Sequence, residues 1–234
     1  MKTITIESLS FNINGKKIID NISLEFEPNK IHGIIGKNGA GKSSLIKCLA
    51  GINKFSGNIN YGDKSLSALS PKELSQLFSY IPQAQDMQNP FTVKEILEFS
   101  RYPWSNKRKL NSEDLEKVNF AVKACEIEAF LDQNFSSLSG GEKQKVMIAA
   151  ALAQSTPVIL MDEITALLDP GQKEKIHALM KRLIDSHEKN IFWITHDIEN
   201  VMGLADTISA IENGSLLFHL KQDSFSLEKL KSIF

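Results

Sequence analysis

The spacing of hydrophobic side chains changes along the chain, and each spacing predicts a different element. Near the N-terminus, apolar and polar residues alternate through 4–9 and again through 22–26, on either side of Asn14-Gly15. Alternation with a period of two is typical of strands, and Asn-Gly is a common hairpin turn. Residues 57–61 predict another short strand. Together these segments predict an antiparallel sheet wrapped against a core.

Continuous apolar runs at 31–35, 158–161 and 191–194 predict a second kind of strand. Such runs are typical of parallel strands that are covered on both faces. Apolar residues at helical spacing in 178–184 predict a helix that crosses between the last two runs. We therefore expect a parallel α/β core.

Two further segments complete the predicted organisation. Residues 92–135 are polar and rich in Glu and Lys, with an apolar stripe at helical spacing, so they predict a helical insertion. Near the C-terminus, Asn213-Gly214 separates two short apolar segments and predicts a hairpin. The expected organisation is one domain over 1–234, with a helical subdomain at approximately 84–150.

Composition excludes several classes of function. The 234 residues include 27 basic and 28 acidic ones, for a net charge of −1, so we expect no nucleic acid partner. Cys48 and Cys125 lie in apolar surroundings outside any CxxC pattern, which favours core positions and a reducing, cytosolic compartment. No apolar stretch approaches the ~20 residues of a membrane helix, and the N-terminus is not a signal peptide.

A glycine-rich segment predicts a phosphate site. Residues 36–43 match G-x-x-x-x-G-K-[ST], between an apolar strand and an amphipathic helix. Glycines let backbone N–H groups turn toward a phosphate chain, and the helix directs its N-terminus at the same place. Lys42 would contact the β- and γ-phosphates, and the Ser43 hydroxyl would ligate Mg²⁺. A chance glycine-rich turn would lack this flanking context.

Two carboxylates, Asp162 and Glu163, follow the apolar run at 158–161. Ligands of α/β proteins bind at the carboxyl ends of parallel strands. Asp162 would reach the Mg²⁺ shell, and Glu163 would polarise an attacking water. Without the phosphate loop, such a pair would equally fit a strand-end surface position.

Ser139-Gly140-Gly141 precedes a predicted helix and suggests a second anion-binding helix N-terminus. Ser139 with Glu142 also makes a capping box, which explains the serine and the glutamate but not the paired glycines. A single protomer does not need two phosphate-binding helix starts, whereas a head-to-tail dimer does.

In their order, these motifs resemble the nucleotide-binding domain of ABC transporters over essentially the whole chain. Three more motifs resemble that family: 80–83 the Q-loop, 166–169 the D-loop and 194–197 the switch-histidine strand end. The resemblance implies an α/β P-loop NTPase (RecA-like) core with an N-terminal antiparallel β subdomain and an inserted helical subdomain. It also implies ATP hydrolysis with ATP and Mg²⁺ as cofactors.

The resemblance implies a set of site residues. The catalytic residues are Glu163, His196, Gln83 and Lys42. The metal ligands are Ser43, Gln83 and Asp162. The nucleotide-binding residues are Gly36, Lys37, Asn38, Gly39, Ala40, Gly41, Lys42, Ser43, Ser44, Ser139, Gly140, Gly141, Asp169 and Ile13. Ser139 and Gly141 would contact the ATP of the opposite subunit, and Asp169 would link the two sites.

The sequence departs from the family pattern at a few positions. Ile13 stands where an aromatic residue usually stacks on adenine, and Phe11, two residues earlier, is predicted to share its face. Ile164 replaces the proline that usually follows the glutamate, and Ala150 replaces an arginine after the signature. These changes bear on nucleotide affinity and base selectivity rather than on hydrolysis.

Residues 91–103 resemble a stretch, TV-x-E…GR-x-P, common in importers of the iron–siderophore, haem and cobalamin type, with Ser100 in place of glycine. A capped helix that stops at Pro103 would give a similar pattern. Phe91, Tyr102 and Trp104 in this region would either meet a permease or fill the core of the helical lobe.

Three hypotheses follow for the function. The first is the ATPase of a metal-chelate importer, a homodimer on the inner face of the cell membrane that binds a separate integral-membrane permease and serves a substrate-binding protein indirectly. The second is a non-transport ABC ATPase of the iron–sulfur assembly or cell-division type. The third, a non-catalytic nucleotide-binding regulator, is disfavoured by intact Lys42, Glu163 and His196. Neighbouring genes would separate the first two.

Overall fold

The computed structural model describes the chain apart from residues 84–89, 106–109, 166–167, 188, 232 and 234. Its N-terminal sheet has the strand order β2-β1-β4-β5 and is antiparallel. The strands are β1 (Ile4–Ile13), β2 (Lys16–Phe26), β4 (Ser56–Tyr61) and β5 (Lys64–Ser65). Asn14 and Gly15 turn β1 into β2 with φ of 49° and 80°, the left-handed conformation that this turn requires.

The second sheet has six strands in the order β10-β9-β3-β8-β7-β6. β10 is antiparallel to β9, and the other neighbouring pairs are parallel. The strands are β3 (Ile31–Ile35), β6 (Phe78–Ile81), β7 (Val158–Asp162), β8 (Asn190–Ile194), β9 (Thr207–Glu212) and β10 (Ser215–Lys221). The parallel strands and the C-terminal hairpin predicted from the apolar pattern are thereby confirmed.

α-Helices, together with short 3₁₀ turns, occupy the remaining regular segments. They are α1 (Lys42–Leu49), α2 (Pro71–Leu77), α3 (Val93–Phe99), α4 (Ser112–Cys125), α5 (Gly140–Gln154), α6 (Pro170–His187), α7 (Ile198–Leu204) and α8 (Leu227–Lys231). α3, α4 and α5 all lie between β6 and β7 in the chain, in the stretch where a helical insertion is expected. Its limits at 84 and 150 stay a prediction, since 84–89 fall outside the described residues. Of the helices described, none is both long and apolar enough to cross a membrane.

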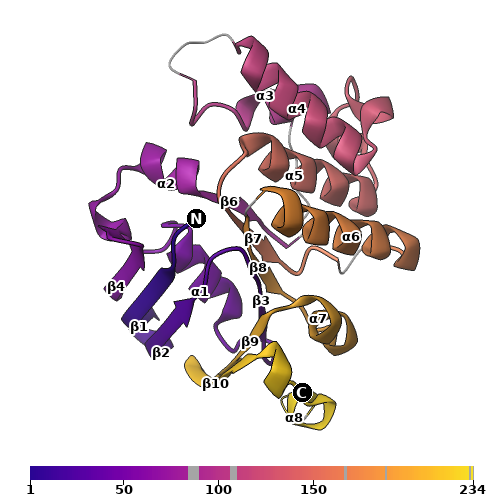
Figure 1. Ribbon diagram of the computed structural model, residues 1–234. Helices are drawn as coiled ribbons and strands as arrows, with labels where there is room; N and C mark the ends of the chain where they lie inside the picture. Colours follow the sequence, from indigo (N-terminus) through magenta and orange to yellow (C-terminus); the bar gives the residue numbers. More distant parts are fainter. Residues whose placement is uncertain (84–89, 106–109, 166–167, 188, 232, 234) are drawn as a thin grey trace.

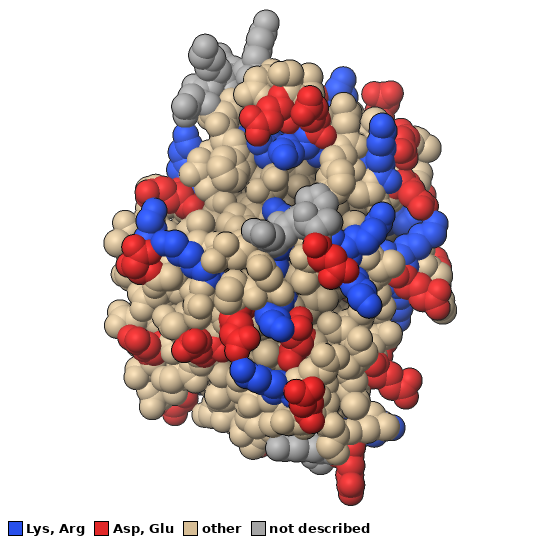
Figure 2. Space-filling view, in the orientation of Figure 1, with Lys and Arg blue, Asp and Glu red and all other residues tan. Residues whose placement is uncertain are grey.

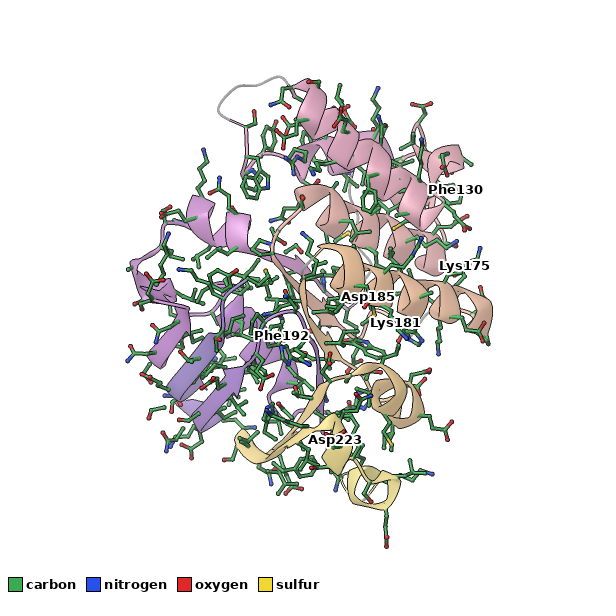
Figure 3. The ribbon with its side chains drawn as sticks, viewed as in Figure 1. Phe130, Lys175, Lys181, Asp185, Phe192 and Asp223 are labelled. Carbon is green, nitrogen blue, oxygen red and sulfur yellow. The ribbon has the colours of Figure 1, made fainter. Side chains whose placement is uncertain are left out.

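Alternate side chains of the six-stranded sheet point into two separate cores. On β8, Phe192 and Ile194 face the core shared with β1, β2 and α1, whereas Ile191 and Trp193 face the core shared with α5, α6 and α7. Figure 1 shows these helices on one side of the sheet and the N-terminal strands on the other. Phe192, labelled in Figure 3, packs edge-on against Phe26 with 4.7 Å between ring centroids. Burial on both faces explains why these strands read as continuous apolar runs.

The two cysteines are buried and free, as the apolar pattern around them predicts. Burial raises the pKa of the Cys48 and Cys125 thiols to about 12, which keeps both protonated near neutral pH. They therefore act as small core side chains rather than as reactive groups.

Among the helices whose N-caps the structure describes, four start with a capping box. In this motif the N-cap side chain accepts from the backbone N–H of the third helical residue, and the side chain of that residue accepts from the N-cap N–H. The N-cap residues are Ser70, Thr92, Asn111 and Ser139. The box at Ser139 matters most for function, because it fixes where α5 begins and how its first N–H groups are presented.

Candidate functional site

The loop between β3 and α1 has the geometry of a phosphate cradle. Gly36 and Gly41 have φ of 149° and 106°, and both are packed tightly against other backbone. A Cβ added at Gly36 would come within 2.2 Å of Ile211 O, and one at Gly41 within 2.8 Å of Ile18 O. A side chain at either position would therefore push the loop away from its neighbours. The described loop fits a nucleotide's phosphates, since its first helical turn offers N–H groups at the same edge.

Lys42 lies folded back over this loop. Its Nζ donates to Gly36 O at 2.8 Å and to Lys37 O at 3.0 Å. Burial lowers the pKa of Lys42, while the nearby carboxylates Glu163 and Asp162 act in the opposite direction. The ammonium is thus held where a terminal phosphate would exchange for the two carbonyl oxygens.

Ser43 and Asp162 supply oxygen atoms of the kind that Mg²⁺ prefers. Ser43 Oγ donates to Asp162 Oδ1 at 3.0 Å, and the Tyr80 hydroxyl donates to Asp162 Oδ2 at 3.2 Å. Burial raises the pKa of Asp162, and these two hydrogen bonds lower it. Burial also raises the pKa of Tyr80, with Asp162 adding to the effect, so the phenol stays a donor. The pair fits a magnesium site that is completed by nucleotide oxygens and water.

The Glu163 carboxylate is held by residues that follow two other strands, β6 and β8. Its Oε2 accepts from Gln83 Nε2 at 2.7 Å, and its Oε1 lies 2.9 Å from His196 Nε2. Its backbone N–H donates to Ile194 O at 3.1 Å, and its φ is 52°. A glutamate in the left-handed region is strained, and such strain concentrates at functional positions. Gln83, Glu163 and His196 thus meet from the ends of β6, β7 and β8, as Branden's rule expects.

Lys42, Ser43, Gln83, Glu163 and His196 share one cavity of about 650 Å³, and Asp162 lies behind it, bonded to Ser43. Its lining residues are Ile13, Lys16, Ile18, Asn38, Gly39, Ala40, Gly41, Lys42, Ser43, Ser44, Gln83, Glu163 and His196. Ile13, 47% exposed, forms part of its apolar wall. The expectation that Phe11 shares the face of Ile13 is wrong. The register of β1 with β2 shifts between 11 and 12, and Phe11 packs against the N-terminal core instead.

The signature residues lie apart from this cavity. Ser139 and Gly140 are exposed at the start of α5, and neither they nor Gly141 line the cavity of their own subunit. Ser139 N donates to Glu142 Oε2 at 2.8 Å and Glu142 N donates to Ser139 Oγ at 3.4 Å, so the capping box and the signature motif use the same residues. Asp169 Oδ1 accepts from Gln172 N at 2.9 Å at the start of α6. The D-loop residues 166 and 167 lie outside the described residues.

Three residues of the site escaped sequence reasoning. Tyr80 belongs to the Q-loop strand, but its bond to Asp162 could be anticipated only from the pairing of β6 with β7. Lys16 and Ile18 enter the cavity because β2 runs past the phosphate loop.

Two departures from the family pattern lie at packing positions, since Ile164 is fully buried and Ala150 packs against the same core.

This arrangement can activate a water molecule beside a bound phosphate chain. Among the described residues that line the cavity, Glu163 is the one carboxylate, and its hydrogen bonds to Gln83 and His196 restrict its orientation. A positioned carboxylate beside a cation site suits an in-line attack on a terminal phosphate.

Comparisons with known proteins agree with this geometry. A family model described as ABC transporter matches residues 19–166. The Petrobactin import ATP-binding protein YclP of Bacillus subtilis (strain 168) is 33% identical over 215 residues, covering 92% of this chain and 85% of that protein. The Hemin import ATP-binding protein HmuV of Rhodococcus jostii (strain RHA1) is 29% identical over 213 residues, covering 91% and 72% respectively.

Among solved structures, the dimeric structure of a bacterial ABC transporter cassette matches with a TM-score of 0.83 and 25% identity. The match covers 95% of this chain and 100% of that one.

Proposed function

Because this chain belongs to the ABC transporter family and is an ATPase of that family, we propose that it powers uptake of a metal chelate through a separate integral-membrane permease. In this proposal it lies on the inner face of the cell membrane and serves an extracytoplasmic substrate-binding protein only indirectly. The observation that carries the proposal is an exposed aromatic surface directly after the Q-loop, argued below.

ATP hydrolysis in this proposal uses the residues gathered in the cavity. Lys42 binds the terminal phosphates, and Ser43 and Asp162 provide hard oxygen ligands for Mg²⁺. When bound with the nucleotide, Mg²⁺ offsets the negative charge on the β- and γ-phosphates. Glu163 accepts the proton of the attacking water, and Gln83 and His196 keep its carboxylate in position.

The working unit in this proposal is a dimer of two identical chains. Ser139 and Gly141 would close over the ATP of the other copy, and Asp169 would connect the two sites. Two observations support this: the signature residues are exposed outside their own cavity, and a matching cassette is dimeric. A head-to-tail pair gives each nucleotide a second helix N-terminus.

An exposed cluster of rings supports docking to a permease. This aromatic surface consists of Phe91, Phe99, Tyr102 and Trp104, which are 40%, 36%, 55% and 40% exposed. Phe91 lies edge-on to Phe99, with ring centroids 4.9 Å apart, and Phe99 stacks on Tyr102 at 5.5 Å. Phe91, Phe99 and Tyr102 thus form a continuous row of ring contacts, and all four rings are at least one third exposed. Contiguous exposed apolar side chains of this kind mark interaction sites.

The occupant that we propose for the aromatic surface is a cytoplasmic helix of the permease. Its apolar face would cover the rings, which are enriched at protein interfaces. On the face that Figure 2 shows, positive and negative side chains are interspersed.

The proposed cargo is a metal chelate of the siderophore, haem or cobalamin type. Support comes from residues 91–103 and from relatives whose names specify import of petrobactin and hemin. A non-transport ABC ATPase, of the iron–sulfur assembly or cell-division type, is the competing hypothesis. Those two relatives favour import.

Co-purification tests the proposal. A candidate permease, sought among the neighbouring genes as a multi-span membrane protein, is expressed with the wild-type chain, with Tyr102→Glu, or with Phe120→Glu. The Phe120→Glu change places the same charge on another exposed ring. We expect the wild type and Phe120→Glu to co-purify with the permease and Tyr102→Glu to be lost. ATP binding checks that each variant is folded. Equal recovery of all three would contradict the docking surface.

A further inference from the structure

Arg101 forms the centre of a buried network that the hydrolysis mechanism does not use. It follows α3, is 4% exposed, and its Nε donates to Asp114 Oδ1 of α4 at 2.9 Å. Asp114 also closes the capping box of α4, where its Oδ2 accepts from Asn111 N at 3.1 Å. The ion pair therefore joins the end of α3 to the start of α4.

The same guanidinium holds the end of α5. Arg101 Nη1 donates to Ala153 O at 2.8 Å and to Gln154 O at 3.1 Å. Trp104 Nε1 donates to Gln154 O at 2.6 Å, and the Arg101 guanidinium carbon lies 5.8 Å from the Trp104 ring centroid. The last carbonyls of a helix lack intrahelical partners and carry partial negative charge, so a cation there binds favourably. α5 runs from this point to Ser139, about 22 Å away at 1.5 Å per residue.

A second branch of the network reaches the strand that leads to Gln83. Gln154 Nε2 donates to Ser75 O at 2.5 Å and to Phe78 O at 3.2 Å, where α2 passes into β6. Gln76 Nε2 donates to Pro103 O at 2.7 Å, between the same segment and the aromatic surface. β6 ends at Ile81, and Gln83 follows two residues later. The network is thus bonded both to the far end of the signature helix and to the start of the Gln83 strand.

Stability alone does not account for this arrangement. A buried ion pair contributes little more than well-packed apolar side chains of the same size, because removing two charges from water offsets their attraction. A planar guanidinium does something an apolar group cannot: its several donors fix Asp114 and two carbonyls in one geometry. The network also contacts Trp104 directly, and Trp104 belongs to the aromatic surface that the proposed permease helix would cover.

We propose that Arg101 is a positioning residue that transmits contact at the aromatic surface to both the signature helix and the Gln83 strand. This inference rests on the proposed function, since it needs a partner at the aromatic surface. Movement of the 101–104 segment shifts Asp114 and the end of α5 together, because the guanidinium bonds to both. Through Gln154, the same movement reaches β6. Docking thereby changes the positions of Ser139 and Gln83 without any contact between the permease and ATP.

Two variants test the network without leaving a buried charge unpaired. Arg101→Met with Asp114→Asn removes the ion pair but keeps an acceptor for Asn111 N, and Gln154→Met removes only the branch to β6. The matched control is Lys175→Met with Glu126→Gln, which removes an exposed ion pair between α6 and α4. Each protein is assayed for thermal stability, permease co-purification, ATP hydrolysis alone, and hydrolysis with the permease.

The decisive quantity is the ratio of permease-stimulated to basal hydrolysis. We expect both network variants to co-purify normally and to keep basal hydrolysis, while the ratio falls about threefold or more. The control should keep the wild-type ratio. An unchanged ratio in both network variants would overturn this inference but leave the proposed function standing. If the basal and the stimulated rates fell by the same factor, the network would have only a structural role, which would also overturn the inference. A wild-type chain that neither binds nor responds to the permease would overturn the proposed function as well.

Discussion

Replacing Glu163 by glutamine tests whether this carboxylate activates the attacking water. The two side chains have the same size, so packing around the end of β7 should persist. One of the two carboxylate oxygens is replaced by an NH₂ group, which donates hydrogen bonds, and the resulting amide cannot accept a proton from water. Because the wild-type oxygens lie 2.7 Å from Gln83 Nε2 and 2.9 Å from His196 Nε2, the substitution also places a donor against one of those two partners.

The size of the effect follows from the role. A positioned general base contributes about 10²–10⁴ in rate, which corresponds to roughly 3–5 kcal/mol of barrier. ATP binding should persist, because Lys42, Ser43 and Asp162 are unchanged. Trapped ATP should also hold two copies together, giving a particle of twice 26.1 kDa.

The assay measures phosphate release under single- and multiple-turnover conditions, together with binding of ATP and particle mass. Glu174→Gln, on the exposed side of α6, is the matched control and should behave as wild type. A decrease in turnover of only about threefold or less would refute the assignment of Glu163 as the base, because losing a positioned base lowers the rate by much more.

Three further predictions concern the partner surface, the base platform and acid stability. Ser139→Phe should keep ATP binding but lower hydrolysis about 100-fold by blocking closure over the partner's ATP, and unimpaired hydrolysis would contradict the dimer. Ile13→Tyr should tighten ATP binding about fivefold or more, because a stacked ring contributes ~1–3 kcal/mol, and the natural chain should discriminate poorly between ATP and GTP in the same titration. Burial lowers the pKa of His32 from 6.5 to about 4. Between these two pH values the unfolded chain is protonated at His32 and the folded chain is not, so stability falls as the pH is lowered through this window. Denaturant unfolding at pH 7 and pH 5 should therefore show a loss of about 2 kcal/mol that His32→Gln reduces, and an equal loss in that variant would place the titration elsewhere.

Much of the fold could be predicted, because the local pattern and the tertiary packing agree. The runs at 31–35, 158–161 and 191–194 are apolar throughout since both sheet faces are buried, and they form β3, β7 and β8. The Asn-Gly turns likewise mark the β1–β2 and β9–β10 hairpins, where positive φ is required.

The limits of sequence reasoning appear where long-range register decides an outcome. Alternation predicts that Phe11 shares the face of Ile13, but the pairing of β1 with β2 shifts between them and Phe11 packs, half-buried, against the N-terminal core. Alternation predicts faces only while the register is unbroken. Arg101 belonged to a recognised helical segment, yet its bonds to Ala153 and Gln154 join residues more than 50 positions apart, which no local pattern encodes.

Site residues from separate motifs could be found because each motif carries its own local signal. Gln83 and His196 were indicated only by the resemblance of their motifs to the family, and their contacts with Glu163 became visible only in the structure. The hydrogen bond from Tyr80 to Asp162 could not be predicted from the sequence, because nothing local distinguishes a tyrosine with this partner from one that only packs in the core.

Uptake of a ferric chelate by cells that lack this gene tests the central claim most directly. The deletion strain is supplied with wild-type protein or with Glu163→Gln at equal abundance, and the radiolabelled chelate retained in the cells is measured. The proposed function predicts that uptake is lost on deletion, restored by the wild type and not restored by Glu163→Gln. Unchanged uptake in the deletion strain, together with a defect in iron-independent cell division or in cluster assembly, would contradict import and favour a non-transport ATPase.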